Sequence, residues 1–235
     1  MKLPSAARLL ILFLAGAALP LSAPAQENRA GIDKSRINAQ ANNVKDFVPS
    51  GWKIEEQVSG DLNGDSMPDY AVKLVESKRI NQDDVINDRQ RALVILLKNK
   101  AGGLSRAAVA DKLLQCTGCG GAFYGVVEAP ANVRIERGVL VVNQDHGSRN
   151  VTEATYRFRY DAASGKFILI GLDVIDNDRV TGETVSESRN YLTGVKITER
   201  IRSGKGRKAV NRSRLPRQKI SIEQVDHERF EQVDR

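Results

Sequence analysis

The chain has 235 residues, of which 41% are hydrophobic and 28% are charged, so it can bury a core and wholesale disorder is excluded. Its formal net charge is +7, which favours an acidic partner only where the positive charge is clustered. Two cysteines exclude a scaffold of several disulfides, and two histidines exclude a histidine-rich metal centre.

Residues 1–25 have the layout of a secretory signal peptide. Lys2 and Arg8 give a positive start, residues 9–21 are apolar, and residues 23–25 (Ala-Pro-Ala) supply the small side chains of a cleavage site. The apolar stretch is shorter than the roughly 20 residues that a membrane-spanning helix needs. We therefore predict a periplasmic or secreted mature chain that has no transmembrane segment.

The mature chain is mostly patterned for β-strands. One short amphipathic helix is expected in the N-terminal segment 26–49, near residues 34–46, because apolar residues recur there at helical spacing. From 50 to 202, apolar and polar residues alternate, and turn residues recur about every ten positions. This pattern predicts a mainly β domain over 50–202, either an antiparallel sheet or sandwich or a set of blade-like hairpins.

Three stretches carry the clearest strand signals. The run 91–98 is apolar almost throughout, which indicates a strand buried on both faces. The dipeptide Arg137-Gly138 separates two alternating runs and predicts a tight hairpin. In 156–160, aromatic residues alternate with Arg157 and Arg159, as in a strand that buries its aromatic face. Stacking of these aromatic residues on nucleic-acid bases is the alternative interpretation.

The end of the chain departs from this pattern. Basic residues are dense over 203–219 and apolar residues there have no period, so a flexible basic tail is predicted over 203–235. Residues 196–219 have a net charge of +9, whereas residues 26–195 have a net charge of −1. The excess charge therefore favours contact of residues 203–219 with an anionic cell surface, and it gives no support for specific nucleic-acid binding.

An acidic loop precedes one of the expected strands. Its candidate ligands are Asp61, Asn63, Asp65 and Asp69, together with the backbone carbonyl near Met67. Calcium takes six to eight oxygen ligands, which this set begins to supply. An EF-hand is excluded because the loop lacks Gly at its sixth position and Glu at its twelfth. We predict a calcium site here; the alternative is a solvated turn held by its own hydrogen bonds.

The stretch from Gly60 to Val72 resembles the calcium loop of FG-GAP or VCBS-type repeats, which are β-propeller blades of secreted and surface proteins. The loop occurs once, so the resemblance does not imply a whole propeller. The longer layout, with a Cys-x-x-Cys-Gly-Gly element at 116–121, is similar to a group of uncharacterised bacterial secreted proteins. The repeat pattern usually has Gly directly after the third ligand, where this chain has Ser66. A left-handed backbone there costs Ser roughly 1 kcal/mol relative to Gly.

Cys116 and Cys119 are followed directly by two glycines. A redox thiol usually lies at a helix N-terminus, and no amphipathic helix follows here. Haem attachment needs a His directly after the second Cys, where this chain has Gly120. A zinc site needs about four ligands, and the two cysteines supply only half of them. A local structural disulfide fits the expected compartment best, and so short a loop gives roughly 2 kcal/mol of stabilisation.

The other polar motifs give no strong catalytic signal. The stretch 143–148 contains Asp145, His146 and Ser148, but a triad is recognised by geometry rather than by adjacency, and a polar loop at the end of a hairpin is the simpler interpretation. We assign no catalytic residue. The sequence favours a calcium-stabilised binding or structural module of unknown ligand. The alternatives are a small extracytoplasmic hydrolase that uses Asp145, His146 or unpaired loop acids, and a polyanion binder that acts through the tail.

Overall fold

The computed structural model of the chain describes residues 31–78, 88–202 and 208–234. The signal peptide predicted over 1–25 lies outside these ranges. Within them, no helix is both long and apolar enough to cross a membrane.

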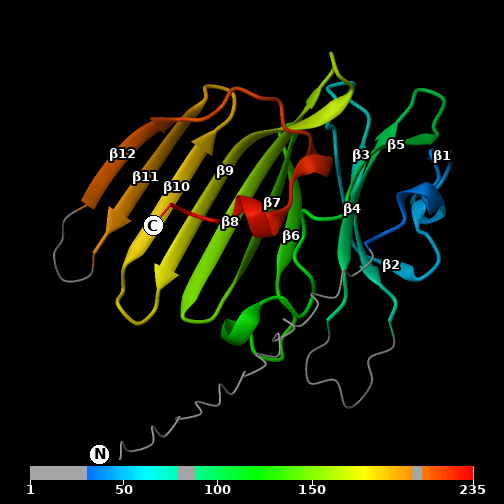
Figure 1. Cartoon of the computed structure of the whole chain (residues 1–235). Coiled ribbons are helices and arrows are strands. Elements are labelled where there is room, and N and C mark those ends of the chain that lie inside the picture. Colours follow the sequence, from blue (N-terminus) through cyan, green and yellow to red (C-terminus); the bar gives the residue numbers. More distant parts are fainter. Residues whose placement is uncertain (1–30, 79–87, 203–207, 235) are drawn as a thin grey trace, which may run out of the picture. The chain divides into compact units, whose positions relative to one another are not determined.

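The described residues form two antiparallel sheets (Figure 1). The smaller sheet has the order β1-β5-β4-β3-β2, and its strands are β1 (Gln40–Ala41), β2 (Trp52–Gly60), β3 (Asp69–Glu76), β4 (Arg91–Lys98) and β5 (Leu104–Ala110). The larger sheet is a meander of the order β12-β11-β10-β9-β8-β7-β6. Its strands are β6 (Ala131–Glu136), β7 (Val139–Gly147), β8 (Asn150–Asp161), β9 (Lys166–Asp178), β10 (Thr184–Asn190), β11 (Val195–Ile201) and β12 (Lys208–Arg214). The prediction of a mainly β, antiparallel fold is confirmed.

Strand β4 is buried on both faces because a separate apolar core lies on each side of the smaller sheet. Leu93 and Ile95 belong to a core shared with the larger sheet. Val94 and Leu96 belong to a second core, which the N-terminal segment covers with side chains that include Phe47. The nearly continuous apolar run of this strand is thereby explained.

The N-terminal helix predicted near 34–46 is wrong. The structure has two 3-10 turns, η1 (Lys34–Arg36) and η2 (Val44–Phe47), on either side of the short strand β1. Asn43 is the N-cap of η2 and has an extended backbone, and its amide donates to the side chain of Asp46 at 3.2 Å in a capping box. A turn therefore begins at this position, and no helix runs through it from residue 34. Pairing of β1 with β5 then holds the intervening backbone extended.

The larger sheet follows the sequence pattern closely. Arg137 and Gly138 have φ values of 50° and 78°, the left-handed pair that a tight two-residue hairpin turn requires. In β8, Tyr156 and Phe158 are fully buried, while the opposite face carries Arg157, which pairs with an aspartate of β9. The predicted hairpin and the predicted buried aromatic face are both confirmed.

The flexible tail predicted over 203–235 is wrong for residues 208–234; residues 203–207 lie outside the described part. Besides the edge strand β12, this segment forms η4 (Ile222–Gln224) and α1 (His227–Phe230). Ile220, Ile222 and Val225 are buried in the core shared by the two sheets, and the backbone amide of Leu169 donates to the carbonyl of Ile220 at 2.8 Å. Figure 1 shows this C-terminal segment crossing one face of the larger sheet.

Candidate functional site

The acidic loop between β2 and β3 is closed by its own side chains. Asp61 accepts hydrogen bonds from the backbone amide of Gly64 on Oδ1 at 2.7 Å and from that of Ser66 on Oδ2 at 2.9 Å. Asp65 accepts one from the amide of Met67 at 2.9 Å. The hydrogen bond from the Ser66 amide is the largest cause that holds the pKa of Asp61 below its ordinary value.

Asp69 differs from the other predicted ligands because it is fully buried. Its two carboxylate oxygens accept hydrogen bonds from the amides of Leu62 at 2.8 Å and Lys98 at 2.9 Å, which ties the loop to β4. Burial is the main cause that raises its pKa, and the negative charges of Asp65 and Asp61 raise it further. The structure thus gathers the predicted carboxylates at one loop. Among the described residues, however, Asp61, Asp65 and Asp69 do not form a group in which one carboxylate oxygen from each lies within 4.8 Å of the other two.

Ser66 has a φ of 65°, so the left-handed backbone expected at this position is present. We predict that Ser66→Gly stabilises the protein by roughly 0.5–1 kcal/mol, because glycine adopts this conformation without steric cost. Urea denaturation measures the change. Ser105→Gly, within β5, is the opposing control and should destabilise the protein. An S66G variant that is less stable than the parent would contradict the strain argument.

Cys116 and Cys119 form a disulfide, as predicted. Their sulfurs and the carboxylate of Asp88 lie within 4.8 Å of one another, but disulfide sulfurs are not the thiolates that bind metal ions. Cys116 is buried, whereas Cys119 is exposed and lines the cleft described next. The disulfide therefore shapes one wall of that cleft.

A cleft of about 600 Å³ lies where the larger sheet meets the C-terminal segment. The stretch 143–147 belongs to β7, so the polar loop predicted there is wrong. The period-two pattern of β7 continues through Gln144 and His146, which point to the same face as the buried Leu140. The remaining lining residues come from residues 115–129, which we call the disulfide segment, and from β8, β9 and the C-terminal segment: Cys119, Thr152, Asp176, His227, Glu228, Glu231, Gln232 and Val233.

Glu231 is the centre of the polar network in this cleft and is only 5% exposed. Its Oε1 accepts hydrogen bonds from Gln144 Nε2 at 2.6 Å and from the Tyr156 hydroxyl at 2.8 Å. Its Oε2 lies 2.8 Å from His146 Nε2. Burial and the charge of Glu231 raise the pKa of Tyr156, which keeps its hydroxyl protonated and able to donate.

The two histidines of the cleft are in opposite environments. The hydrogen bond to Glu231 raises the pKa of His146, although burial opposes it. Burial is the main cause that lowers the pKa of His227. The Nδ1 atom of His227 is buried and has no hydrogen-bond partner among the described residues. One imidazole is therefore favoured in its charged form, and the other in its neutral form.

These opposite shifts predict how stability depends on pH. Both groups start from an ordinary pKa of 6.5. The stabilisation from His146 is present below pH 6.5 and is lost as the pH rises through the raised pKa of this group in the folded state. The stabilisation from His227 is present above pH 6.5 and is lost as the pH falls through the lowered pKa of this group in the folded state.

Unfolding free energies measured at a series of pH values check this prediction. His146→Gln should remove part of the loss on the alkaline side, and His227→Gln should remove part of the loss on the acid side. The two variants thus serve as controls for each other. Identical pH profiles for the parent and both variants would contradict the assignment.

Negative charge predominates in the cleft lining, where the one group favoured in a positive form, the His146 imidazole, pairs with Glu231. The lining contains three carboxylates, on Asp176, Glu228 and Glu231, and neither a lysine nor an arginine. Asp176 accepts hydrogen bonds from Asn150 at 2.9 Å and Thr152 at 3.1 Å. Glu228, in contrast, is exposed at the rim. Such a lining attracts positively charged molecules and repels anions.

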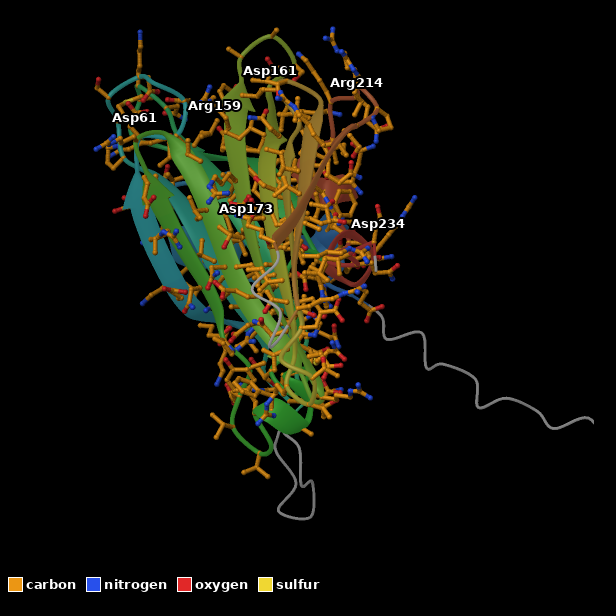
Figure 2. The ribbon with its side chains drawn as sticks, turned by 90° about the vertical axis from the view of Figure 1, so that its left-hand side faces the viewer. Asp61, Arg159, Asp161, Asp173, Arg214 and Asp234 are labelled. Atoms are coloured by element: carbon orange, nitrogen blue, oxygen red, sulfur yellow. A yellow bond between two sulfur atoms is a disulfide. The ribbon has the colours of Figure 1, made fainter. Side chains whose placement is uncertain are left out.

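Figure 2 shows Asp61 well separated from Asp234 of the C-terminal segment, so the acidic loop and the cleft are two different sites. The sequence pointed to the first site and missed most of the second. Of the cleft lining it named His146, within a supposed loop, and Cys119, as one half of a disulfide. The alternation of Leu140, Val142, Gln144 and His146 was the available signal. Nothing local marks Glu231, because its partners lie 75 to 87 residues earlier in the chain.

Comparison of the chain with family models, with curated proteins and with solved structures finds no match.

Proposed function

We propose that this protein is an extracytoplasmic, calcium-stabilised β module that binds a small organic cation in the cleft under its C-terminal segment. The observation that carries the proposal is the composition of the cleft lining, with three carboxylates, two imidazoles and no lysine or arginine. The unpaired Nδ1 of His227 adds a buried polar atom for a ligand to satisfy. Val233 and Cys119 supply apolar contact for a short carbon chain.

A protonated primary amine is the ligand group that we favour. An ammonium offers three hydrogen-bond donors and no acceptor, which complements a lining rich in acceptors. Calorimetric titration with 1,4-diaminobutane tests this, with 1,4-butanediol and succinate as neutral and anionic probes of the same length. Heat from the diamine alone supports the proposal. Equal heats from the three probes, or no heat from any of them, would overturn it.

The rim carboxylate provides a matched test. Glu228→Gln should weaken diamine binding about two- to fivefold, the effect of losing one exposed charge interaction. Glu223→Gln, in η4 and outside the cleft lining, is the control and should leave binding unchanged.

We assign the calcium ion to the acidic loop, with Asp61, Asn63, Asp65, Asp69 and the carbonyl near Met67 as ligands. The donor set fits a hard cation, since it consists of carboxylate, amide and carbonyl oxygens. The left-handed Ser66 gives the loop the turn that the resembling repeats make with glycine. The expected role of the ion is to stabilise the fold, because the loop lies apart from the cleft (Figure 2).

Melting curves with calcium and with chelator test this assignment. Calcium at ten times its dissociation constant should add about 1.4 kcal/mol to the stability. Asp65→Asn should reduce this gain, and Asp173→Asn, in β9 of the larger sheet, should leave it intact. An unchanged melting temperature together with no heat on calcium titration would exclude the ion.

Acid–base catalysis in the same cleft is the second candidate function, and the opposite pKa shifts of the two histidines favour it. In a hydrolytic reaction, neutral His227 would take a proton from the attacking water, and charged His146 would give a proton to the leaving group. Release of nitrophenol from nitrophenyl esters and glycosides tests this role. Turnover that is lost in both His146→Gln and His227→Gln would replace the binding proposal.

A further inference from the structure

The outer face of β11 and β12 combines positive charge with exposed apolar side chains. The antiparallel register pairs Ile197 with Arg212 and Ile201 with Lys208. Directly paired residues point to the same side of a sheet, and alternate residues along a strand share a face. What we call the β11–β12 outer face therefore consists of Val195, Ile197, Glu199, Ile201, Lys208, Val210, Arg212 and Arg214.

Most apolar members of this face are open to solvent. Val210 is 59% exposed, Ile201 46% and Ile197 36%. Strand β12 is at the edge of the larger sheet, so these side chains contribute little to the folded core. Apolar side chains that gather among basic ones on an exposed surface are typical of an interaction site.

On the inner face of the same strands, Lys196 and Arg200 contact the C-terminal segment. Lys196 pairs with Asp234, and Arg200 donates to the backbone carbonyl of Asp234 at 2.5 Å, so both hold the C-terminal segment. On the outer face, Lys208 pairs with Glu199 at 2.7 Å. Arg212 and Arg214 make no ion pair with any residue in the described ranges. Their charge is therefore directed outward and uncompensated.

We propose that the β11–β12 outer face docks the protein on an anionic phospholipid bilayer. Arg212 and Arg214 contact lipid phosphates, and Val210 and Ile201 enter the interfacial layer. A hydrated polyanion such as a sulfated polysaccharide offers charge complementarity but no place for aliphatic side chains, whereas a bilayer surface accepts both. This inference goes beyond the cleft and is independent of what the cleft binds.

Vesicle co-sedimentation tests the charged part of the face. The purified protein should bind vesicles of phosphatidylglycerol and phosphatidylcholine, and should bind vesicles of phosphatidylcholine alone far less. The double variant Arg212→Gln/Arg214→Gln should lower the partition coefficient about 25-fold, since each basic residue near an anionic surface contributes about fivefold. Residues 203–207 are unchanged in the variant, so they cannot account for the difference.

A matched control removes the same charge elsewhere. Lys45 in η2 and Lys100 between β4 and β5 are exposed, and Lys45→Gln/Lys100→Gln should leave the partition within about twofold, because distant charges are screened. Equal losses in the two double variants would show adsorption by net charge alone and would overturn the proposal. Equal binding to anionic and neutral vesicles would also overturn it.

The apolar part separates a bilayer from a polyanion. Ile201→Ser/Val210→Ser should lower the vesicle partition several-fold and leave retention on heparin unchanged, with an unaltered melting temperature as the check on folding. Unchanged vesicle binding in this variant, or heparin retention by the parent without vesicle binding, would overturn the proposal in favour of a polyanion partner.

Discussion

Glu231→Ala should lower the free energy of unfolding by about 3–4 kcal/mol, because it strips the acceptor from three buried or half-buried donors. Gln144, Tyr156 and His146 all donate to this carboxylate. Gln144 and Tyr156 are fully buried, so water cannot take the place of the carboxylate as their acceptor. Urea denaturation followed by circular dichroism measures the loss. Glu231→Gln, which keeps one oxygen acceptor, should lie between the parent and the alanine variant.

The neighbouring residue Glu228 supplies the control. It lies in α1, which Glu231 directly follows, but it is exposed, so Glu228→Ala should change the stability by no more than about 0.5 kcal/mol. A Glu231→Ala variant as stable as Glu228→Ala would mean that the C-terminal segment does not pack on the sheet in solution. Such a result would also remove the cleft.

Arg91→Leu should cost about 3–5 kcal/mol, the range for breaking a buried ion pair by removing one partner. Arg91 is 3% exposed and contacts Glu55 through Nε at 2.8 Å and Nη2 at 2.7 Å. Its Nη1 donates to the carbonyls of Ala129 at 2.7 Å and Gln115 at 3.3 Å. One guanidinium thus joins β2, β4 and both ends of the disulfide segment.

The pKa of Glu55 gives a second measurement on the same variant. Burial raises the pKa of Glu55, but the hydrogen bonds and charge of Arg91 outweigh burial and hold it below its ordinary value of 4.5. Stability from this group is therefore present above pH 4.5 and is lost as the pH falls through the lowered folded pKa. In Arg91→Leu, this part of the acid-induced loss should disappear.

Arg134 provides the matched control for Arg91. Its ion pair with Glu136 has a similarly short distance of 2.5 Å, but its side chain is 46% exposed. Arg134→Leu should cost less than about 1 kcal/mol, as exposed pairs do. Similar losses for the two leucine variants would contradict the view that burial decides the strength of the Arg91 contact.

The sequence was most informative where structure depends on local pattern. Alternation placed Tyr156 and Phe158 on a buried face, and a glycine after Arg137 marked a turn whose left-handed backbone follows from local sterics. Cys116 and Cys119 are close in sequence, so the prediction of a disulfide between them required only the assumption of an oxidising compartment. Each of these predictions depends on neighbours within a few residues.

The sequence was least informative where a segment packs on distant surface. The stretch 208–234 has few apolar residues and no period, but Ile220, Ile222 and Val225 suffice because the sheets already offer an apolar surface to them. The helix prediction for the N-terminal segment was wrong for the opposite reason. Its apolar residues have helical spacing, but the segment pairs through β1 with β5 instead of forming a helix. Tertiary contacts decided both segments.

The late position of the C-terminal segment has a consequence for folding. The contacts of Glu231 with Gln144 and His146 span 87 and 85 residues, and contacts of such separation form slowly. During synthesis from the N-terminus, the larger sheet is complete before residues 220–234 exist, so the surface that receives Ile222 stays open to water and to other chains. Expression yield should therefore depend on these residues more than their small share of the core suggests, and a chaperone that shields the open sheet would act in this interval.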